Sequence, residues 1–184
     1  KDMQLNDWFN KGLSSEQYVN GMNVNKDELL SIKHKYVLNA PNEFHTLQNQ
    51  RLRALILTAD WCGDAMVNLP IFMAIADAAN IEARYFIRDE NLELMDQFLT
   101  NGTARSIPII ILINEDGSVY AKWGPRAAKV QDIVDKYKSS LPDKEASEFE
   151  PAFKEFIQKL SALYTTDSSI WEMIEEDMLN AFVK

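Results

Sequence analysis

The residues best suited to chemistry lie in the segment Trp61-Cys62-Gly63-Asp64-Ala65, which contains the only cysteine of the chain. Residues 53–59 before it form a nearly continuous apolar run typical of a buried strand, and the residues after it begin a helical pattern. A thiol at such a junction lies beside free N–H groups and the positive end of the helix dipole, which both favour the thiolate. A thiolate attacks disulfide sulfur, so Cys62 is the candidate nucleophile for thiol–disulfide exchange.

The fourth position of a Cys-x-x-Cys pair is occupied by Ala65, so the chain cannot close an internal disulfide. A mixed disulfide formed at Cys62 must then be released by an external thiol, which is monothiol chemistry. We expect the Cys62 thiol to be exposed and reactive. The alternative is a partly shielded, inert thiol.

Charged residues near the cysteine are expected to change its pKa. Asp60 and Asp64 lie two residues to either side of Cys62, and their carboxylates would raise the pKa of the thiol. Arg105 or Lys122 would offset them if either side chain lies close. Asp64 has a second interpretation, because an acidic residue in the first turn stabilises a helix through its dipole.

The composition indicates a globular protein without a nucleic-acid or membrane partner. The chain has 184 residues, 46% hydrophobic and 26% charged, and a formal net charge of −9. Phosphate binding needs a basic patch, and none stands out. The longest strongly apolar run, residues 107–113, is far too short to cross a bilayer. A single cysteine fits a reducing compartment, so we expect a cytoplasmic location.

Hydrophobic patterning predicts an α/β fold in the middle of the chain. The predicted order is strand 53–59, helix 63–79, strand 83–87, helix 92–99, strand 109–113, strand 119–123 and a helix around 130–137. The residues Glu115-Asp116-Gly117-Ser118 predict a hairpin turn between the last two strands. This order indicates a mixed sheet with helices on both faces.

Both ends of the chain are predicted to be helical. In the N-terminal part, Ser14-x-x-Gln17 matches a capping box, and Asn25 is expected to cap the next helix. In the C-terminal part, two apolar stripes predict two helices, the second capped by Asp167 or Ser169. We expect the aromatic faces of these helices to pack on the sheet; the alternative is a partner surface.

Three motifs in this order resemble the thioredoxin superfamily over about residues 50–140. They are Ala59-Asp60-Trp61-Cys62-Gly63-Asp64-Ala65, with Pro70 where thioredoxins carry a helix proline; Arg105-Ser106-Ile107-Pro108 before an apolar strand; and Asp116-Gly117 followed by Lys122-Trp123-Gly124. The resemblance implies a thioredoxin-like mixed sheet flanked by helices at 50–140. It leaves an N-terminal helical extension at 1–49 and a C-terminal one at 141–184, packed on the domain.

The resemblance also implies roles for particular residues. In the family, the proline that matches Pro108 has a cis peptide bond and faces the nucleophile. Ile107 and Pro108 would then form a wall on which an extended peptide could pair, the alternative being a purely architectural turn. The residues expected to shape the surroundings of the sulfur are Trp61, Gly63 and Asp64.

Two positions depart from the family pattern. Ala65 stands in place of the resolving cysteine, and Ile56 stands where thioredoxins keep a buried acid that assists proton transfer. We therefore expect a thioredoxin-like protein with monothiol exchange chemistry at Cys62, acting on a protein or on a low-molecular-weight thiol or disulfide. The alternatives are a non-catalytic binding or adaptor module that keeps the groove, and a protein in which Ala65 replaces a native cysteine.

No cofactor or metal pattern accompanies these motifs. The two histidines, His34 and His45, lie far from Cys62 in the sequence, so no metal-ligand spacing is present. No pattern indicates an oligomeric state.

Overall fold

A four-stranded mixed sheet lies at the centre of the computed structural model, which describes residues 3–184. Its strands are β1 (Arg53–Thr58), β2 (Glu82–Ile87), β3 (Ile109–Ile113) and β4 (Val119–Trp123). They lie in the order β2-β1-β3-β4, with β1 parallel to β2 and antiparallel to β3, and with β3 antiparallel to β4. The predicted α/β class with a mixed sheet is confirmed.

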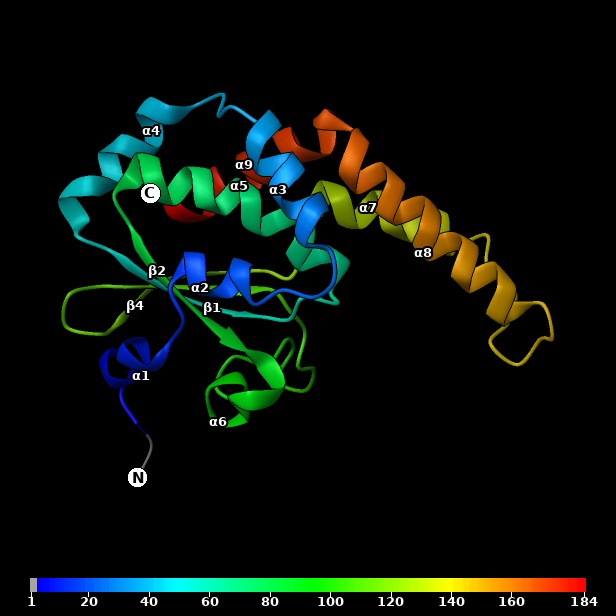
Figure 1. The fold of residues 1–184 in the computed structure, drawn as a ribbon, viewed down its shortest axis with the longest axis horizontal. Coiled ribbons are helices and arrows are strands. Elements are labelled where there is room, and N and C mark those ends of the chain that lie inside the picture. Colours follow the sequence, from blue (N-terminus) through cyan, green and yellow to red (C-terminus); the bar gives the residue numbers. More distant parts are fainter. Residues whose placement is uncertain (1–2) are drawn as a thin grey trace.

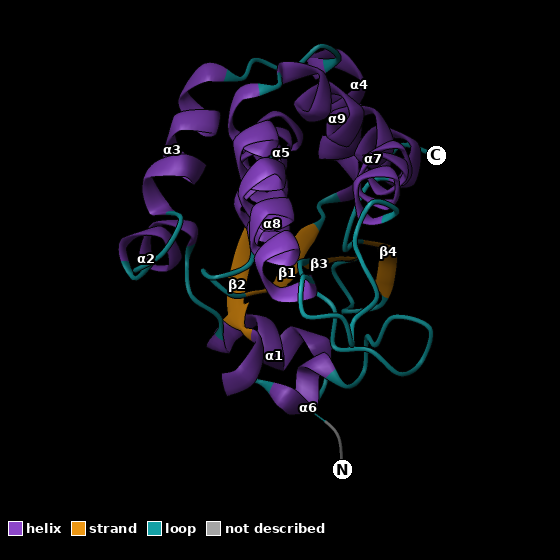
Figure 2. Cartoon of the chain, turned by 90° about the vertical axis from the view of Figure 1, so that its right-hand side faces the viewer, coloured by secondary structure: helices purple, strands orange, loops and turns teal. Residues whose placement is uncertain are grey.

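Helices cover both faces of this sheet (Figure 1). The helices are α1 (Leu5–Lys11), α2 (Ser15–Asn20), α3 (Lys26–Lys35), α4 (Pro41–His45), α5 (Gly63–Ala79), α6 (Leu92–Met95), α7 (Ala128–Lys138), α8 (Phe149–Thr166) and α9 (Ser168–Phe182), with short 3-10 turns η1 (Thr46–Gln50) and η2 (Arg88–Glu90). On one face α5 is flanked by α3, α7 and α9, whereas α1 and α6 lie on the other face (Figure 2). Within the described residues, no helix is long and apolar enough to span a bilayer.

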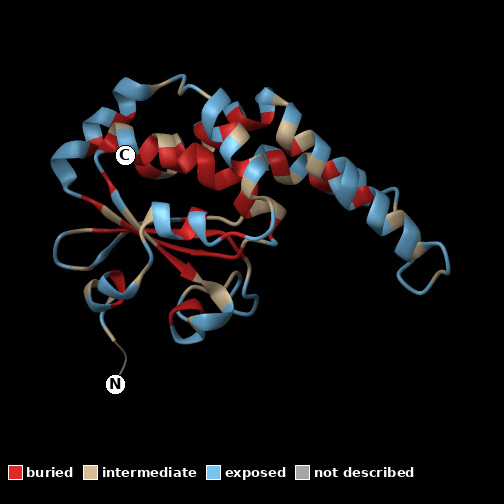
Figure 3. Ribbon diagram, viewed as in Figure 1, coloured by how far each residue is buried: buried red, intermediate tan, exposed pale blue. Residues whose placement is uncertain are grey.

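The strand and the helix on either side of Cys62 are among the most buried parts of the molecule (Figure 3). In β1 every residue after Arg53 is buried, as the continuous apolar run predicts for a central strand. Helix α5 is apolar nearly all round and is therefore buried on most of its sides. Its C-cap residue, Asn80, adopts the left-handed conformation at φ 54°. This rigid strand–helix unit fixes the position of the cysteine between them.

The segment between α1 and α2 attaches to the edge of the sheet. Leu13 and Tyr85 exchange backbone hydrogen bonds of 2.9 and 2.8 Å, which adds a short antiparallel bridge beside β2. The capping box predicted at Ser14 is confirmed. Asn25 lies at the N-cap position of α3 as predicted, but it is left-handed and its side chain makes no capping hydrogen bond. It donates instead to the carbonyl of Asp60 at 3.0 Å.

The C-terminal helices differ in how they pack. Helix α9 lies on α5 and contributes Phe182 to the core, and Asp167 caps it through the N–H of Ser169, as predicted. Helix α8 projects beyond the rest of the molecule, and its outer half is mostly exposed (Figure 3). Side chains from both terminal segments and from the sheet form one contiguous core. The division at residues 49/50 and 140/141 stays a prediction.

One predicted helix is shorter than expected. The apolar pattern at 92–99 predicts a helix over the whole segment, but α6 ends at Met95 and the chain continues in turns. Leu94 and Met95 already bury the apolar side of this short helix. The next two residues, Asp96 and Gln97, are exposed, and Phe98 packs on the core from a turn rather than from a continued helix.

Candidate active site around Cys62

The sulfur of Cys62 lies at the start of α5, where the sequence predicts it. Cys62 is the N-cap residue, and its Sγ accepts a hydrogen bond from the N–H of Ala65 at 3.4 Å. The thiol in turn donates to the carbonyl oxygen of Ile107 at 3.5 Å. The helix start and the segment before β3 therefore meet at this atom, although they are 45 residues apart in the sequence.

The expectation of an exposed thiol is wrong. Only 9% of Cys62 is exposed, and burial is the largest of the influences that raise the pKa of its thiol. The charge of Asp64 raises this pKa further, whereas the N–H groups of Ala65 and Asp64 and the charge of Arg126 lower it. The helix start favours the thiolate as predicted, but the loss of hydration outweighs it. At neutral pH the resting group is a thiol.

Asp64 belongs to a polar cluster that the sequence does not reveal. Its two carboxylate oxygens accept from the Arg126 guanidinium at 3.0 and 2.6 Å, and the Tyr164 hydroxyl donates to Oδ1 at 2.8 Å. Arg126 also donates to Gln131 at 2.9 Å. The Arg126 and Asp64 side chains are mostly buried, so this pair is screened little by solvent. The cluster ties the loop before α7 and the helix α8 to the start of α5.

The other charged residues that the sequence places near Cys62 make their contacts elsewhere. The Asp60 carboxylate accepts from the N–H groups of Asn23 and Val24, at 2.8 and 3.3 Å, and holds the loop before α3. Arg105 pairs with Asp96 on the surface at 2.8 Å, and Lys122 lies exposed on β4. None of these three is among the groups that shift the pKa of Cys62. Arg126 is the cation that offsets Asp64.

The segment opposite Cys62 contains a cis peptide bond between Ile107 and Pro108. Both residues are buried, and Ile107 presents its carbonyl to the thiol. Gly124, directly after β4, packs against this segment: it has φ 125°, and a Cβ there would collide with the Pro108 carbonyl, so no side chain fits. The role of Ile107 and Pro108 as a peptide-binding wall stays a prediction.

Trp61 and Gly63 lie at the open side of the site. Trp61 is 54% exposed, and the Arg88 guanidinium lies over its ring at 4.9 Å from the centroid. This cation–π contact holds the indole beside the cysteine. A Cβ added to Gly63 would meet nothing within 4 Å, so space remains open directly next to Cys62. The structure thus brings Trp61, Gly63 and Asp64 together around the sulfur.

A cleft opens at this site between α7 and α8, and we call it the α7–α8 cleft. It has a volume of about 380 Å³ and is lined at its inner end by Cys62, Asp64 and Arg126. One wall is formed by α8 from Tyr164 outward, and the other by α7. Ile107 and Pro108 are not among its lining residues. The approach to the sulfur inside this cleft is therefore bounded by α8.

Metal ligands do not gather at this site or elsewhere in the part of the chain that the structure describes. His34 and His45 are exposed, at or near the ends of α3 and α4. Among residues 3–184, no three His, Cys, Asp or Glu side chains lie close enough to hold an ion.

Comparison with known proteins adds family and fold information. A thioredoxin family model matches residues 12–138. No curated protein gives a significant match. Among solved structures, a protein of unknown function from Pseudomonas aeruginosa is similar at TM-score 0.62 and 16% identity, covering 95% of this chain and 99% of that chain.

Two further solved structures are similar to parts or most of the chain. An HIV epitope-scaffold protein gives TM-score 0.61 at 14% identity, over 95% of this chain and 99% of that chain. Thioredoxin O2 from Arabidopsis thaliana in the oxidized state gives TM-score 0.34 at 15% identity, over 54% of this chain and 90% of that chain. The family match extends over more than half of the sequence and includes the strand–helix unit that carries Cys62. The chain belongs to the thioredoxin family.

Proposed function

We propose that this protein carries out monothiol thiol–disulfide exchange, with Cys62 as the nucleophile. The observation that carries the proposal is the position of the Cys62 sulfur. It accepts a hydrogen bond from the N–H of Ala65 at the start of α5, and Cys62 lines the inner end of the α7–α8 cleft, through which we expect a small disulfide to approach. The single cysteine of the chain fits a reducing compartment such as the cytoplasm.

The reaction has two steps, and each is an exchange of one S–S bond for another. First, the Cys62 thiol loses its proton to solvent and the thiolate attacks one sulfur of a disulfide R–S–S–R; a bond from Cys62 to that sulfur forms and the second R–S leaves as a thiolate. Second, an external low-molecular-weight thiol, as its thiolate, attacks the mixed disulfide at the sulfur of R and releases the Cys62 thiolate. Electrons balance within each step, so no further oxidant is needed.

The surroundings of Cys62 determine the speed of the first step. Because burial raises the pKa of the thiol, only a small fraction is thiolate at neutral pH. A thiolate of high pKa is intrinsically more nucleophilic, which offsets part of this loss. Ile56 is fully buried at the position where the family has an acid, so it offers no group to carry the proton. We expect a slow reaction that accelerates as the pH rises.

A second candidate function is binding without turnover. The specific observation in its favour is the same burial, since a protonated and shielded sulfur is a poor nucleophile. In that case the cleft would bind a partner and Cys62 would serve only as part of its floor.

One experiment separates the two candidates. Because Cys62 is the only cysteine, the mass of the intact protein reports directly on this residue. We expect native protein incubated with the disulfide of mercaptoethanol to gain one adduct, at a rate that rises roughly tenfold per pH unit below the thiol pKa. A Cys62→Ser variant should gain none. A native protein that gains no adduct, while the same chain in urea does, would favour binding without turnover.

A further inference from the structure

The walls of the α7–α8 cleft expose large apolar side chains to solvent. Trp61, Phe153 and Ile157 are 54%, 39% and 46% exposed, and all three line this one cleft. Large apolar side chains that converge on a concave site mark a binding surface, because contact with water is unfavourable for each of them. The cysteine lies at the inner end of this apolar surface.

The cleft extends along α8, with Cys62 at its inner end. Along α8 its lining runs from Tyr164 to Phe153, a rise of roughly 16 Å at about 1.5 Å per residue. Along α7 it runs outward to Lys138, the last residue of that helix. A volume of about 380 Å³ lies at the lower end of small-molecule sites and is too small for a folded partner to enter. A single extended arm fits this shape.

The positive charges of the cleft are not equivalent. The Arg126 guanidinium is occupied by Asp64 at the inner end. Lys138 also lines the cleft, and within residues 3–184 its ammonium group forms no ion pair. Lys138 is therefore the cation of the cleft that remains available to a ligand. It favours a ligand with a negative group at the end away from the sulfur.

We propose that the α7–α8 cleft binds a low-molecular-weight thiol, or its disulfide, whose aliphatic arm lies along Phe153 and Ile157 and ends in a carboxylate beside Lys138. The inference rests on the proposed function, because the ligand sulfur is then the one exchanged with Cys62. The S–S bond of the ligand breaks, the bond to Cys62 forms, and the other half of the ligand leaves as a thiolate that takes a proton from solvent.

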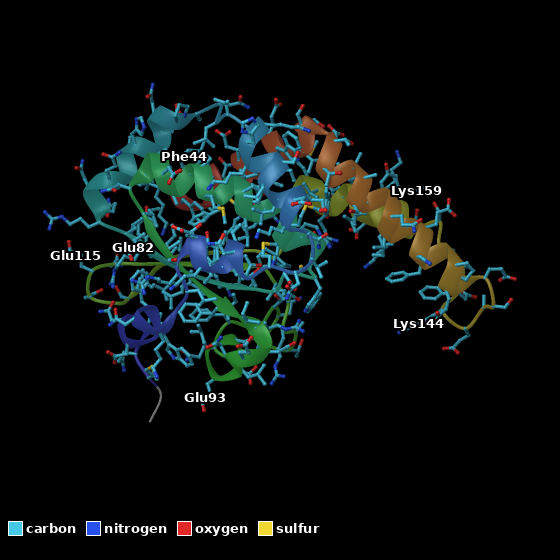
Figure 4. The ribbon with its side chains drawn as sticks, in the orientation of Figure 1. Phe44, Glu82, Glu93, Glu115, Lys144 and Lys159 are labelled. Atoms are coloured by element: carbon cyan, nitrogen blue, oxygen red, sulfur yellow. The ribbon has the colours of Figure 1, made fainter. Side chains whose placement is uncertain are left out.

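Three symmetrical disulfides test this assignment, made from mercaptooctanoate, aminooctanethiol and mercaptoethanol. We expect the carboxylate disulfide to form the Cys62 adduct at least about tenfold faster than the disulfide of mercaptoethanol, because its arm is buried. It should also exceed the amine disulfide by about fivefold through the charge of Lys138. Lys138→Glu should reverse that preference. Lys144→Glu, a charge reversal in the loop at the far end of the projecting segment (Figure 4), should not.

Phe153→Ser gives a second, independent readout. Because Phe153 is partly exposed on α8, its loss should leave the fold intact. We expect it to slow both long-armed disulfides severalfold more than it slows the disulfide of mercaptoethanol. Equal rates for all three disulfides in the native protein would overturn the assignment and leave the proposed function standing. An apolar peptide disulfide that reacts faster than any of them would also overturn it.

If Cys62 does not exchange at all, a binding measurement with an unreactive ligand still tests the assignment. The methyl thioether of mercaptooctanoate cannot react, and calorimetry on the Cys62→Ser variant measures its affinity directly. We expect saturable binding that Lys138→Glu weakens at least about fivefold. Absence of binding would overturn the assignment. Absence of any adduct with every disulfide would overturn the proposed function instead.

Discussion

Removing one hydroxyl group from Tyr164 tests whether the polar cluster holds α8 against the cysteine helix. The ring of Tyr164 is buried, and its hydroxyl donates to Asp64 Oδ1 at 2.8 Å across 100 residues of sequence. Burial and the charge of Asp64 raise the pKa of this tyrosine, so the hydroxyl stays a donor at any ordinary pH. Tyr164→Phe removes that donor and changes the volume of the side chain little.

The expected loss of stability follows from the charge of the acceptor, Asp64. A hydrogen bond to a charged group contributes about 1.5–3 kcal/mol to the free energy of unfolding. Because Asp64 keeps both contacts with Arg126, we expect the lower limit, about 1.5 kcal/mol. For a chain of 184 residues this corresponds to a decrease in Tm of roughly 3–6 °C.

Urea unfolding followed by circular dichroism measures this loss. Tyr137→Phe is the matched control, because Tyr137 is exposed and its hydroxyl has no hydrogen bond within the described residues; we expect a change below about 0.5 kcal/mol there. In an Asp64→Asn background, the acceptor charge is gone and Tyr164→Phe should cost about 0.5 kcal/mol. If Tyr164→Phe costs no more than Tyr137→Phe, the hydroxyl does not stabilise the attachment of α8 and our reasoning is refuted.

Three further predictions concern other parts of the molecule. Ala65→Cys places a second sulfur beside Cys62, so we expect insulin disulfide reduction to rise from near zero to a clear rate; an unchanged rate would contradict the role we give the missing thiol. Burial raises the pKa of Tyr18 to about 12 and raises that of Tyr85, whereas tyrosines in the unfolded chain ionise near about 10. Unfolding therefore releases protons above that pH, and urea midpoints should be steady below about pH 10 and fall between about pH 10 and 12; a constant midpoint to pH 11 would speak against it. Glu175 is buried and accepts from two backbone N–H groups at 2.8 Å each, so Glu175→Ala should cost about 3 kcal/mol in urea unfolding and Glu175→Gln clearly less, and equal costs would count against carboxylate pairing.

The sheet and its main helix could be predicted from the sequence because their signals are local. The apolar run of β1 and the all-round apolar character of α5 each require burial wherever they are placed. Capping at Ser14 and Asp167 involves neighbours no more than three residues away, and these predictions are confirmed. Asn25 makes no capping hydrogen bond because a distant carbonyl, that of Asp60, competes for its side chain.

The surroundings of Cys62 depend on contacts that no local pattern encodes. Arg126 reaches Asp64 across 62 residues and Tyr164 reaches it across 100. The only sequence signal for Arg126 is its place directly after Gly124-Pro125, at the end of β4. The exposure of the sulfur was predicted wrongly for a related reason. The helix start alone favours an accessible thiolate, but packing by segments far along the chain buries the thiol.

The most direct test of monothiol exchange at Cys62 is catalysis of exchange between a small disulfide and an external thiol, measured above the uncatalysed rate. We predict that the native protein adds to this rate in proportion to its concentration, through many equivalents of disulfide, and more strongly at higher pH. The Cys62→Ser variant should add nothing. A native protein whose added rate equals that of Cys62→Ser would contradict the proposed function.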